Sequence, residues 1–456
     1  MFAPLQKLMI EHALYPLMEK RRGNHIREYY RALRQTEAAA PEALHALQRE
    51  RLEALLLDCV QHVPAYQGCL TEEEIHADPF AALRRLPPVR KTDIRANPDA
   101  YLNTSIPASA RIANVTGGST GQPLRFFMDR AQVEQYEAAR WRGLSWYGIT
   151  FGSRSVMIWG NPIELGQNAQ AKHAARERLL KNRVILSAYE LNGQTLRERI
   201  DFLNRYQPEY LYGYASALYA FARLLQPHRQ LLRLKKLKAV VSTSETLHPE
   251  QAELLREVFG CPVANEYGAR DAGILAYTCP ACGKLHITAE NALIEVLDPV
   301  TLQPVPDGTD GVLAVTDLCN HIMPRPRYLL GDTGTRSAAP CSGCAVTLPT
   351  LDQVGGREDA LFLLPDGTLI HGNFIGQLAR RYASVLQFQL VQTDPAHAVL
   401  YLVQQPDHDD EREALLTEAR AVLTGVDLRC ETVDEIAPTA SGKLRYAVRT
   451  FPLPQK

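Results

Sequence analysis

The chain has 456 residues, about three times the usual domain length, so we expect one large domain and a smaller one. Its 50 lysine and arginine residues balance 51 acidic residues, which gives no electrostatic indication of nucleic acid or an anionic membrane as a partner. No stretch approaches the roughly 20 apolar residues of a membrane span, and the first residues interleave charge with apolar positions, unlike a signal peptide. We therefore expect a cytoplasmic protein with reduced thiols.

Apolar positions recur at helical spacing through residues 1–75, which predicts a helical N-terminal segment. From about residue 110 to 350, β-branched runs such as residues 154–160 and 238–245 alternate with helical patterns such as residues 250–259. This alternation is typical of α/β layers around a buried sheet. The fold class we predict is therefore α/β, with layered mixed sheets and helices.

A compact unit of roughly 100 residues is predicted to follow the polar, glycine-bearing stretch 353–360. Its expected elements are strands at 369–372, 386–392 and 398–405, helices at 372–383 and 410–423, and a final strand. These elements predict a small, mobile α+β domain. We divide the chain into a large N-terminal domain, residues 1–355, and a small C-terminal lid domain, residues 356–456.

Residues 114–124, NVTGGSTGQPL, form a candidate phosphate-binding loop. Glycine allows the backbone to approach phosphate oxygens closely, and hydroxyls can hydrogen bond to them. The loop is not of the GxxxxGK[ST] type, because Gln122 follows the last glycine. An ordinary turn is the alternative. The residues concerned are Thr116, Gly117, Gly118, Ser119, Thr120 and Gly121.

Two further loops follow strand-like runs. In residues 265–273, the ring of Tyr267 can lie against adenine, and Asp271 can hold magnesium, a cation that prefers carboxylate oxygen. In residues 327–334, the carboxylate of Asp332 can accept hydrogen bonds from ribose hydroxyls. For each loop alone, a solvated turn at the end of a strand is an equally good interpretation.

The stretch 355–359, GGRED, lies where the composition changes and is a candidate hinge. Near the end of the chain, Lys443 lies in a Ser-Gly-Lys turn at 438–445. A lysine on a mobile domain can be delivered to an active site to stabilise negative charge developing on phosphorus. A solvated surface lysine is the alternative.

Two C-x-x-C pairs can supply the four thiolates of a structural zinc site. They are Cys279 with Cys282, and Cys341 with Cys344. His286 competes for the fourth position with Cys282. Such a site would join the segment after Asp271 to the segment after Asp332, and it would stabilise the nucleotide site without taking part in catalysis.

Five of these motifs occur in one order, and together they resemble the adenylate-forming superfamily of acyl-CoA synthetases. The closest resemblance is to the phenylacetate-CoA ligase branch and to capsule-biosynthesis proteins of CapK type, and it covers nearly the whole chain. TGGSTG is similar to the family's TSGSTG, YGARD to YG-x-x-E, MPRPRYLLGD to MPLIRYRIGD, GRED to GR-x-D, and PTASGKLR to the SGK lysine segment.

The resemblance implies roles for individual residues. The phosphate loop, Tyr267, Asp332 and Arg357 would bind ATP, and Asp271 would hold Mg²⁺. Asp359 would be the hinge and Lys443 would assist catalysis. The substrate site would draw on Tyr212, Gly213, Tyr214 and Ser216, for which core packing is the alternative.

The implied activity is ATP-dependent activation of a small carboxylic acid as acyl-AMP, with release of pyrophosphate and then acyl transfer to a thiol such as coenzyme A. Three positions depart from the family pattern: Asp271 replaces a glutamate, Gln122 replaces a lysine, and residues 361–369 replace K-x-x-G-x-R. The last departure concerns the second half-reaction. Acyl transfer to an amine, a sugar hydroxyl or a carrier protein is therefore an open alternative. A second alternative is a zinc-stabilised scaffold that binds nucleotide without turnover.

Overall fold

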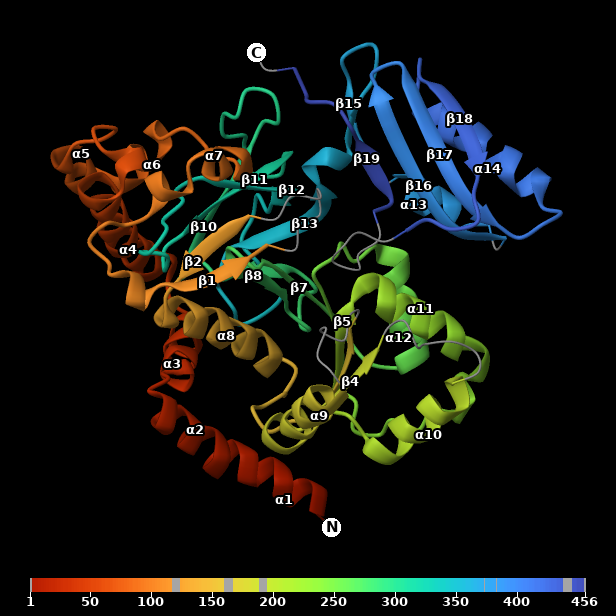
Figure 1. The fold of residues 1–456 in the computed structure, drawn as a ribbon, viewed down its shortest axis with the longest axis horizontal. Coiled ribbons are helices and arrows are strands. Elements are labelled where there is room, and N and C mark those ends of the chain that lie inside the picture. Colours follow the sequence, from red (N-terminus) through yellow and green to blue (C-terminus); the bar gives the residue numbers. More distant parts are fainter. Residues whose placement is uncertain are drawn as a thin grey trace.

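One eleven-stranded sheet runs through the larger part of the protein (Figure 1). The computed structural model describes residues 2–116, 124–159, 167–187, 195–372, 374–382, 384–437 and 445–454, with only the backbone of residues 2–4 and 167–173. The strand order is β10-β11-β12-β13-β9-β8-β7-β6-β5-β3-β4. The strands are β3 (Ser155–Trp159), β4 (Arg183–Ser187), β5 (Tyr210–Tyr214), β6 (Ala239–Thr243), β7 (Val263–Ala269), β8 (Gly273–Thr278), β9 (Leu285–Ile287), β10 (Ala292–Leu297), β11 (Asp310–Asp317), β12 (Tyr328–Arg336) and β13 (Thr350–Arg357).

The sheet is parallel from β4 to β7 and antiparallel from β7 to β10. The parallel strands are covered on both faces, so β6 reads AVVST and is buried throughout. One face packs against Leu218, Phe221 and Leu255, and the other against Trp141 and Leu144. The covering helices are α8 (Arg130–Ser145), α10 (Leu196–Tyr206), α11 (Ala215–Leu225) and α12 (Pro249–Phe259), with α9 (Gln167–Lys181) beside β4. The expected α/β layers are confirmed.

Strand order changes direction at β3, which lies between β4 and β5. In open α/β sheets, ligands bind beyond the carboxyl ends of the strands at such a switch point. Trp159 ends β3 and Tyr214 ends β5, and their ring centroids are 4.1 Å apart. We therefore expect a ligand to bind at the carboxyl ends of β3 and β5.

Helices cover the antiparallel half and form the N-terminal part of the chain, as the sequence predicts (Figure 1). Leu52, Leu55 and Leu56 of α4 are fully buried in the core that includes Leu313 and Val315. No helix among the described residues is long and apolar enough to cross a membrane. The helices are α1 (Phe2–Met9), α2 (Tyr15–Arg22), α3 (Ile26–Thr36), α4 (Pro41–His62), α5 (Glu72–Ala77), α6 (Pro79–Arg85) and α7 (Lys91–Ala96), and a short hairpin of β1 (Ile112–Val115) and β2 (Arg125–Met128) follows.

The last hundred residues build a separate four-stranded sheet of order β18-β17-β16-β19. Alternating residues such as Leu390 and Leu400 face a core that α13 and α14 complete. The predicted strands and helices are confirmed, although α13 is shorter than expected. The elements are β14 (Leu361–Leu363), β15 (Leu369–His371), α13 (Phe374–Ala379), β16 (Val385–Asp394), β17 (His397–Gln404), α14 (Asp409–Val422), β18 (Asp427–Thr432) and β19 (Ala447–Arg449).

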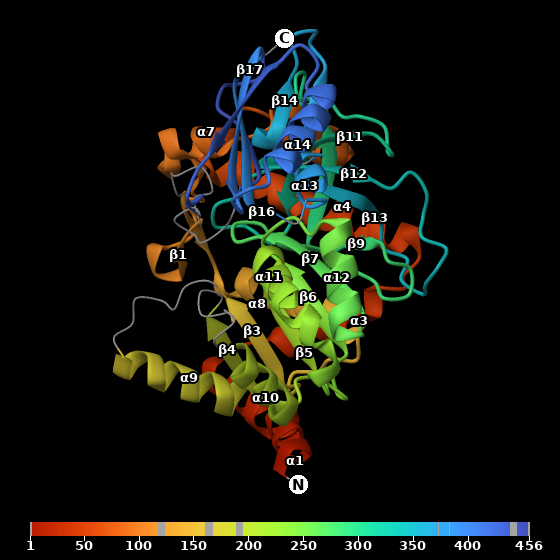
Figure 2. The same cartoon turned by 90° about the vertical axis from the view of Figure 1, so that its right-hand side faces the viewer.

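The large sheet continues to Arg357 at the end of β13, so the division expected between residues 355 and 356 falls inside that strand. The small C-terminal part lies at the end of the molecule opposite α1, in both views (Figures 1 and 2). Arg380 forms an ion pair with Glu250 of α12, and the ring of Tyr446 lies 6.3 Å from that of His248. His371 Nε2 lies 3.1 Å from Thr333 Oγ1 of β12.

This contact surface predicts that docking of the small domain depends on pH. Burial lowers the pKa of His371 to about 4, and burial together with the charge of Arg380 lowers that of His248 to about 4. A histidine released into water has its ordinary pKa near 6.5. The docking equilibrium constant is therefore highest above pH 6.5. It falls as the pH drops toward 4, by about tenfold per histidine for each pH unit.

Small-angle scattering at pH 7.5 and pH 5.5 tests this prediction, and we expect a larger radius of gyration at pH 5.5. His371→Asn should reduce the pH response, whereas His397→Asn, which changes an exposed histidine paired with Asp394, should leave it intact. An unchanged radius of gyration across this range would contradict the prediction.

Candidate functional site

Asp332 forms hydrogen bonds to two other predicted nucleotide-binding residues, each on a different strand. Its Oδ2 accepts a hydrogen bond from the Tyr267 hydroxyl at 3.1 Å, and its Oδ1 accepts one from Arg357 Nη1 at 2.8 Å. Tyr267 comes from β7, Asp332 from β12 and Arg357 from β13. The structure therefore brings together Tyr267, Asp332 and Arg357, which are 25 to 90 residues apart in sequence.

The glycine before Asp332 makes this arrangement sterically feasible. Gly331 has a φ of +79°, and a Cβ there would lie 2.7 Å from Arg357 Nη2. A side chain would therefore be strained and would displace the guanidinium. The Gly-Asp pair in RYLLGDTG is thus explained by its contact with Arg357.

Asp271 is almost completely buried, at 2% exposure, between aromatic and cationic groups. Its Oδ2 accepts a hydrogen bond from the Tyr328 hydroxyl at 2.7 Å and lies 3.8 Å from Lys91 Nζ. Burial alone would raise the pKa of Asp271, but the charges of Lys91 and Arg325 and the Tyr328 hydrogen bond outweigh it and hold that pKa below its ordinary value. Asp271 is therefore an ionised carboxylate.

Of the six predicted phosphate-binding residues, only Thr116 lies among the described residues. Thr116 is buried, and its Oγ1 accepts a hydrogen bond from the Leu124 amide at 2.8 Å, which joins the two ends of the loop. Five predicted phosphate-binding residues lie outside the described residues, as does Lys443: Gly117, Gly118, Ser119, Thr120 and Gly121.

The predicted hinge is held by charges on both sides. Asp359 Oδ2 accepts a hydrogen bond from Arg445, which is two residues after Lys443. Glu358 forms an ion pair with Arg90 at 3.1 Å, and its carbonyl accepts from Arg449 at 3.5 Å. Residues next to the hinge therefore connect α7, the hinge and the lysine segment.

The predicted substrate residues lie at the carboxyl end of β5. The Tyr212 hydroxyl donates to Glu266 Oε1 at 2.6 Å, and Tyr214 packs against Trp159. A Cβ on Gly213 would lie 2.5 Å from the Ile158 carbonyl, so a glycine permits the close approach to β3. The Ser216 amide, at the start of α11, donates to Glu245 Oε2 at 2.8 Å.

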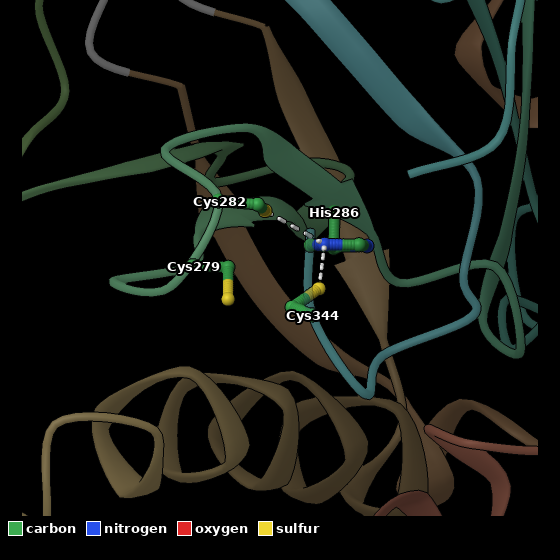
Figure 3. A group of neighbouring side chains, drawn as sticks. All are labelled: Cys279, Cys282, His286 and Cys344. Carbon is green, nitrogen blue, oxygen red and sulfur yellow. Dashed lines mark hydrogen bonds between the residues drawn. The ribbon is translucent and has the colours of Figure 1, made fainter. Parts of the chain in front are cut away.

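Cysteine and histidine side chains meet beside β8 and β9 (Figure 3). The ligand atoms of Cys279, Cys282, His286 and Cys344 all lie within 4.8 Å of one another. His286 Nε2 lies 3.4 Å from Cys282 Sγ and 3.3 Å from Cys344 Sγ, while its Nδ1 donates to the Leu348 carbonyl at 2.9 Å. That carbonyl fixes the ring with Nε2 toward the sulfur atoms, as second-shell partners of metal-binding histidines do.

Cys341 is adjacent to this group without belonging to it. Its Sγ lies 3.7 Å from Cys344 Sγ. The group of four thus contains both candidates for the fourth ligand, Cys282 and His286, and it does not contain Cys341. The distances suit a tetrahedral ion held by three thiolates and one imidazole, for which Zn–S is roughly 2.3 Å.

Sequence reasoning missed several charged residues that contact the predicted site. Lys91 and Arg325 face Asp271 from segments 180 and 54 residues away, and Arg140 and Glu266 contact Tyr212. A glutamate within the buried strand VANEYGA was the one local signal, because an unpaired charge is costly there. Lys91 had no such signal.

Two family models and several known proteins match this chain. A family model described as AMP-binding enzyme matches residues 185–321, and one described as CapK C-terminal domain matches residues 362–450. Protein CapK of Staphylococcus aureus is 24% identical over 454 residues, 98% of this chain and 97% of that protein. Phenylacetate-coenzyme A ligase of Thermus thermophilus is 25% identical over 335 residues, 72% of this chain and 73% of that protein.

The fold has a counterpart among solved structures. A crystal structure of 2-hydroxyisobutyryl-CoA ligase in the postadenylation state matches with a TM-score of 0.69 and 23% identity, and the match covers 90% of both chains. This likeness confirms the predicted fold class, a large layered α/β part with a smaller C-terminal part. The chain thus carries a segment that matches the AMP-binding enzyme model, followed by one that matches the CapK C-terminal domain model.

Proposed function

We propose that the protein activates a carboxylic acid with ATP, forming an acyl-adenylate and pyrophosphate, and then transfers the acyl group to a thiol such as coenzyme A. The observation that supports this most is the Asp332 carboxylate, fixed by Tyr267 and Arg357 next to the hinge. A carboxylate so fixed can accept hydrogen bonds from both ribose hydroxyls. The Tyr267 ring borders the same position and can stack with adenine.

The first step joins two anions, the substrate carboxylate and the α-phosphate, so alignment and charge neutralisation are the main tasks. Loop residues 116–121 would bind the phosphates, and Lys443 would offset the charge that develops on the α-phosphate. Arg445, bonded to Asp359, connects the lysine segment to the hinge. A rotation about Asp359 would then withdraw Lys443 and admit the acceptor.

Asp271 fits the role of a magnesium ligand, because Mg²⁺ is usually held by one or two carboxylates together with substrate phosphates. Its carboxylate is ionised, since nearby cations keep its pKa low. When bound, Mg²⁺ would neutralise charge on the phosphates. Asp271 is one methylene shorter than the family's glutamate. Lys91 and Arg325 lie beside it and supply part of the positive charge that phosphate binding needs.

The acceptor is a separate question, because the family's K-x-x-G-x-R stretch is absent after the hinge. Residues 361–371 instead form the short β14–β15 hairpin. A thiol acceptor agrees with the CoA ligases among the relatives. An amine or a sugar hydroxyl stays the alternative, and AMP release in the presence of each acceptor separates them.

We also propose that Cys279, Cys282, His286 and Cys344 hold a structural zinc ion. Burial lowers the pKa of His286, which favours the neutral imidazole that a metal ligand requires. The ion would join the β8–β9 turn to the segment before β13, whose other end carries Arg357. It would thereby stabilise the nucleotide site without touching substrate.

Removal of the lysine tests the adenylation step. In acid-dependent ATP–pyrophosphate exchange, Lys443→Ala should lower the rate by at least about 100-fold, the usual cost of one transition-state charge contact. Lys236→Ala, which changes an exposed lysine, should retain the wild-type rate. Equal rates for Lys443→Ala and wild type would contradict the assigned role.

Removal of the carboxylate tests the nucleotide site. Asp332→Ala should weaken ATP binding about 10- to 100-fold, because charge-assisted hydrogen bonds contribute roughly 1.5–3 kcal/mol. Calorimetric titration with ATP measures the change, and Asp201→Ala on the exposed surface of α10 is the matched control. Wild-type affinity in Asp332→Ala would rule out ribose binding at this residue.

Single substitutions test the zinc site. Wild-type protein should contain one zinc per chain by elemental analysis, and His286→Asn and Cys344→Ser should lose it with a Tm lower by about 5 °C or more. Cys341→Ser is the matched control and should keep the metal, because Cys341 lies outside the group of four. Metal loss in Cys341→Ser, or no metal in wild type, would refute this ligand set.

A further inference from the structure

A network of charged and hydroxyl groups lies on the α8 side of the large sheet, next to the predicted nucleotide site. Adjacent residues of a strand point to opposite faces, so Glu266 and Tyr267 of β7 face different sides. Tyr267 points to Asp332, and Glu266 points to α8. The network therefore begins at Glu266, next in sequence to Tyr267, whose ring we propose to stack with adenine.

Glu266 is the centre of this network and is only 1% exposed. Its Oε1 accepts hydrogen bonds from the Tyr212 hydroxyl at 2.6 Å and from Thr243 Oγ1 at 3.2 Å. Arg140 Nε donates to Oε2 at 3.2 Å. Tyr212 and Thr243 lie at or near the carboxyl ends of β5 and β6, the edge where the topology places a ligand.

Arg140 extends the network toward solvent. Its Nη1 donates to Glu137 Oε2 at 2.9 Å, and its guanidinium lies 5.8 Å from the centre of the Tyr212 ring. The side chains of Arg140 and Glu137 are 32% and 33% exposed, so both can be reached by a ligand. Arginine has five N–H donors, and the hydrogen bonds within the described part of the chain engage one on Nε and one on Nη1.

The network determines which acyl groups bind well. An unsubstituted alkyl or aryl group covering Arg140 and Glu137 would remove water from charged groups and offer no hydrogen bond in return. A hydroxyl can accept from Arg140 and donate to Glu137, and an ammonium can donate to Glu137. A second carboxylate is disfavoured, because two carboxylates face one guanidinium here.

We propose that Arg140 and Glu137, with Arg140 positioned by Glu266 and Tyr212, form the polar end of the acyl-binding site, and that the acid activated by this protein carries a hydroxyl or amino group on its acyl chain. This inference rests on the proposed adenylation activity and names its substrate class. It differs from the aryl acid named in phenylacetate-coenzyme A ligase, one of the relatives.

Matched acids test the substrate class in ATP–pyrophosphate exchange. Two sets differ at one group: propionate, 3-hydroxypropionate and β-alanine, and benzoate, 4-hydroxybenzoate and 4-aminobenzoate, with succinate as the dicarboxylate. In at least one set we expect kcat/KM for the hydroxy-substituted or amino-substituted acid to exceed that of the unsubstituted acid by about 100-fold or more. Sites built to bind a substrate hydroxyl discriminate to this extent.

Variants test the residues. Replacing both charges in Arg140→Met with Glu266→Leu should reduce that ratio to within about tenfold, because the buried carboxylate is removed together with its partner and the partly exposed Glu137 can be hydrated. Tyr212→Phe keeps the packing and should lower kcat/KM for the polar acid by about tenfold without affecting the parent acid. The control is Arg27→Met with Glu19→Leu, a partly buried ion pair between α2 and α3, which should leave the ratio unchanged.

The outcomes separate the two proposals. Exchange that is equal or stronger with the unsubstituted acids, or an acid ratio that does not change in Tyr212→Phe or in the double variant, would overturn the acyl-site proposal and leave adenylation intact. No exchange with any acid would contradict adenylation itself, and the acyl-site proposal would fall with it.

Discussion

The hydrogen-bonded contact of Asp332 with Tyr267 and Arg357 links the parts of this protein that a nucleotide would need together. Tyr267 belongs to the strand at which the sheet changes from parallel to antiparallel, and Arg357 is the last residue of the large sheet before the hinge. Because one carboxylate receives both donors, a shift of either strand would leave a charge with fewer partners. The parallel half, the antiparallel half and the start of the small domain are therefore fixed relative to one another at this point.

The predicted hinge begins directly after this contact. Arg357 is fixed by Asp332, while the next two residues, Glu358 and Asp359, pair with Arg90 and Arg445. These partly exposed ion pairs are individually weak, since water competes for them. Weak ion pairs of that kind suit the hinge role that we propose for Asp359.

Charge is also distributed unevenly across the two faces of the parallel strands. One face is an apolar core with α11 and α12, whereas the α8 face carries Glu266, Arg140 and Tyr212 among its apolar residues. An ion pair whose carboxylate is buried, as Glu266 is here, seldom adds stability beyond that of apolar packing of similar volume. Its retention beside the expected ligand edge agrees with a role in binding.

The sequence by itself determined the α/β class, the small C-terminal unit and the identity of Tyr267, Asp271, Asp332 and the cysteine pairs as residues of interest. Those features are local: periodicity, glycine-bearing turns and C-x-x-C spacing reflect short-range geometry. Tertiary structure decided which groups meet. It brought His286 between Cys282 and Cys344, placed Lys91 beside Asp271 and joined Arg140 to Glu266. Cys282 and His286 are four residues apart, but the other pairings span 58 to 180 residues, and only the strand order and the packing of helices on the sheet bring those residues together.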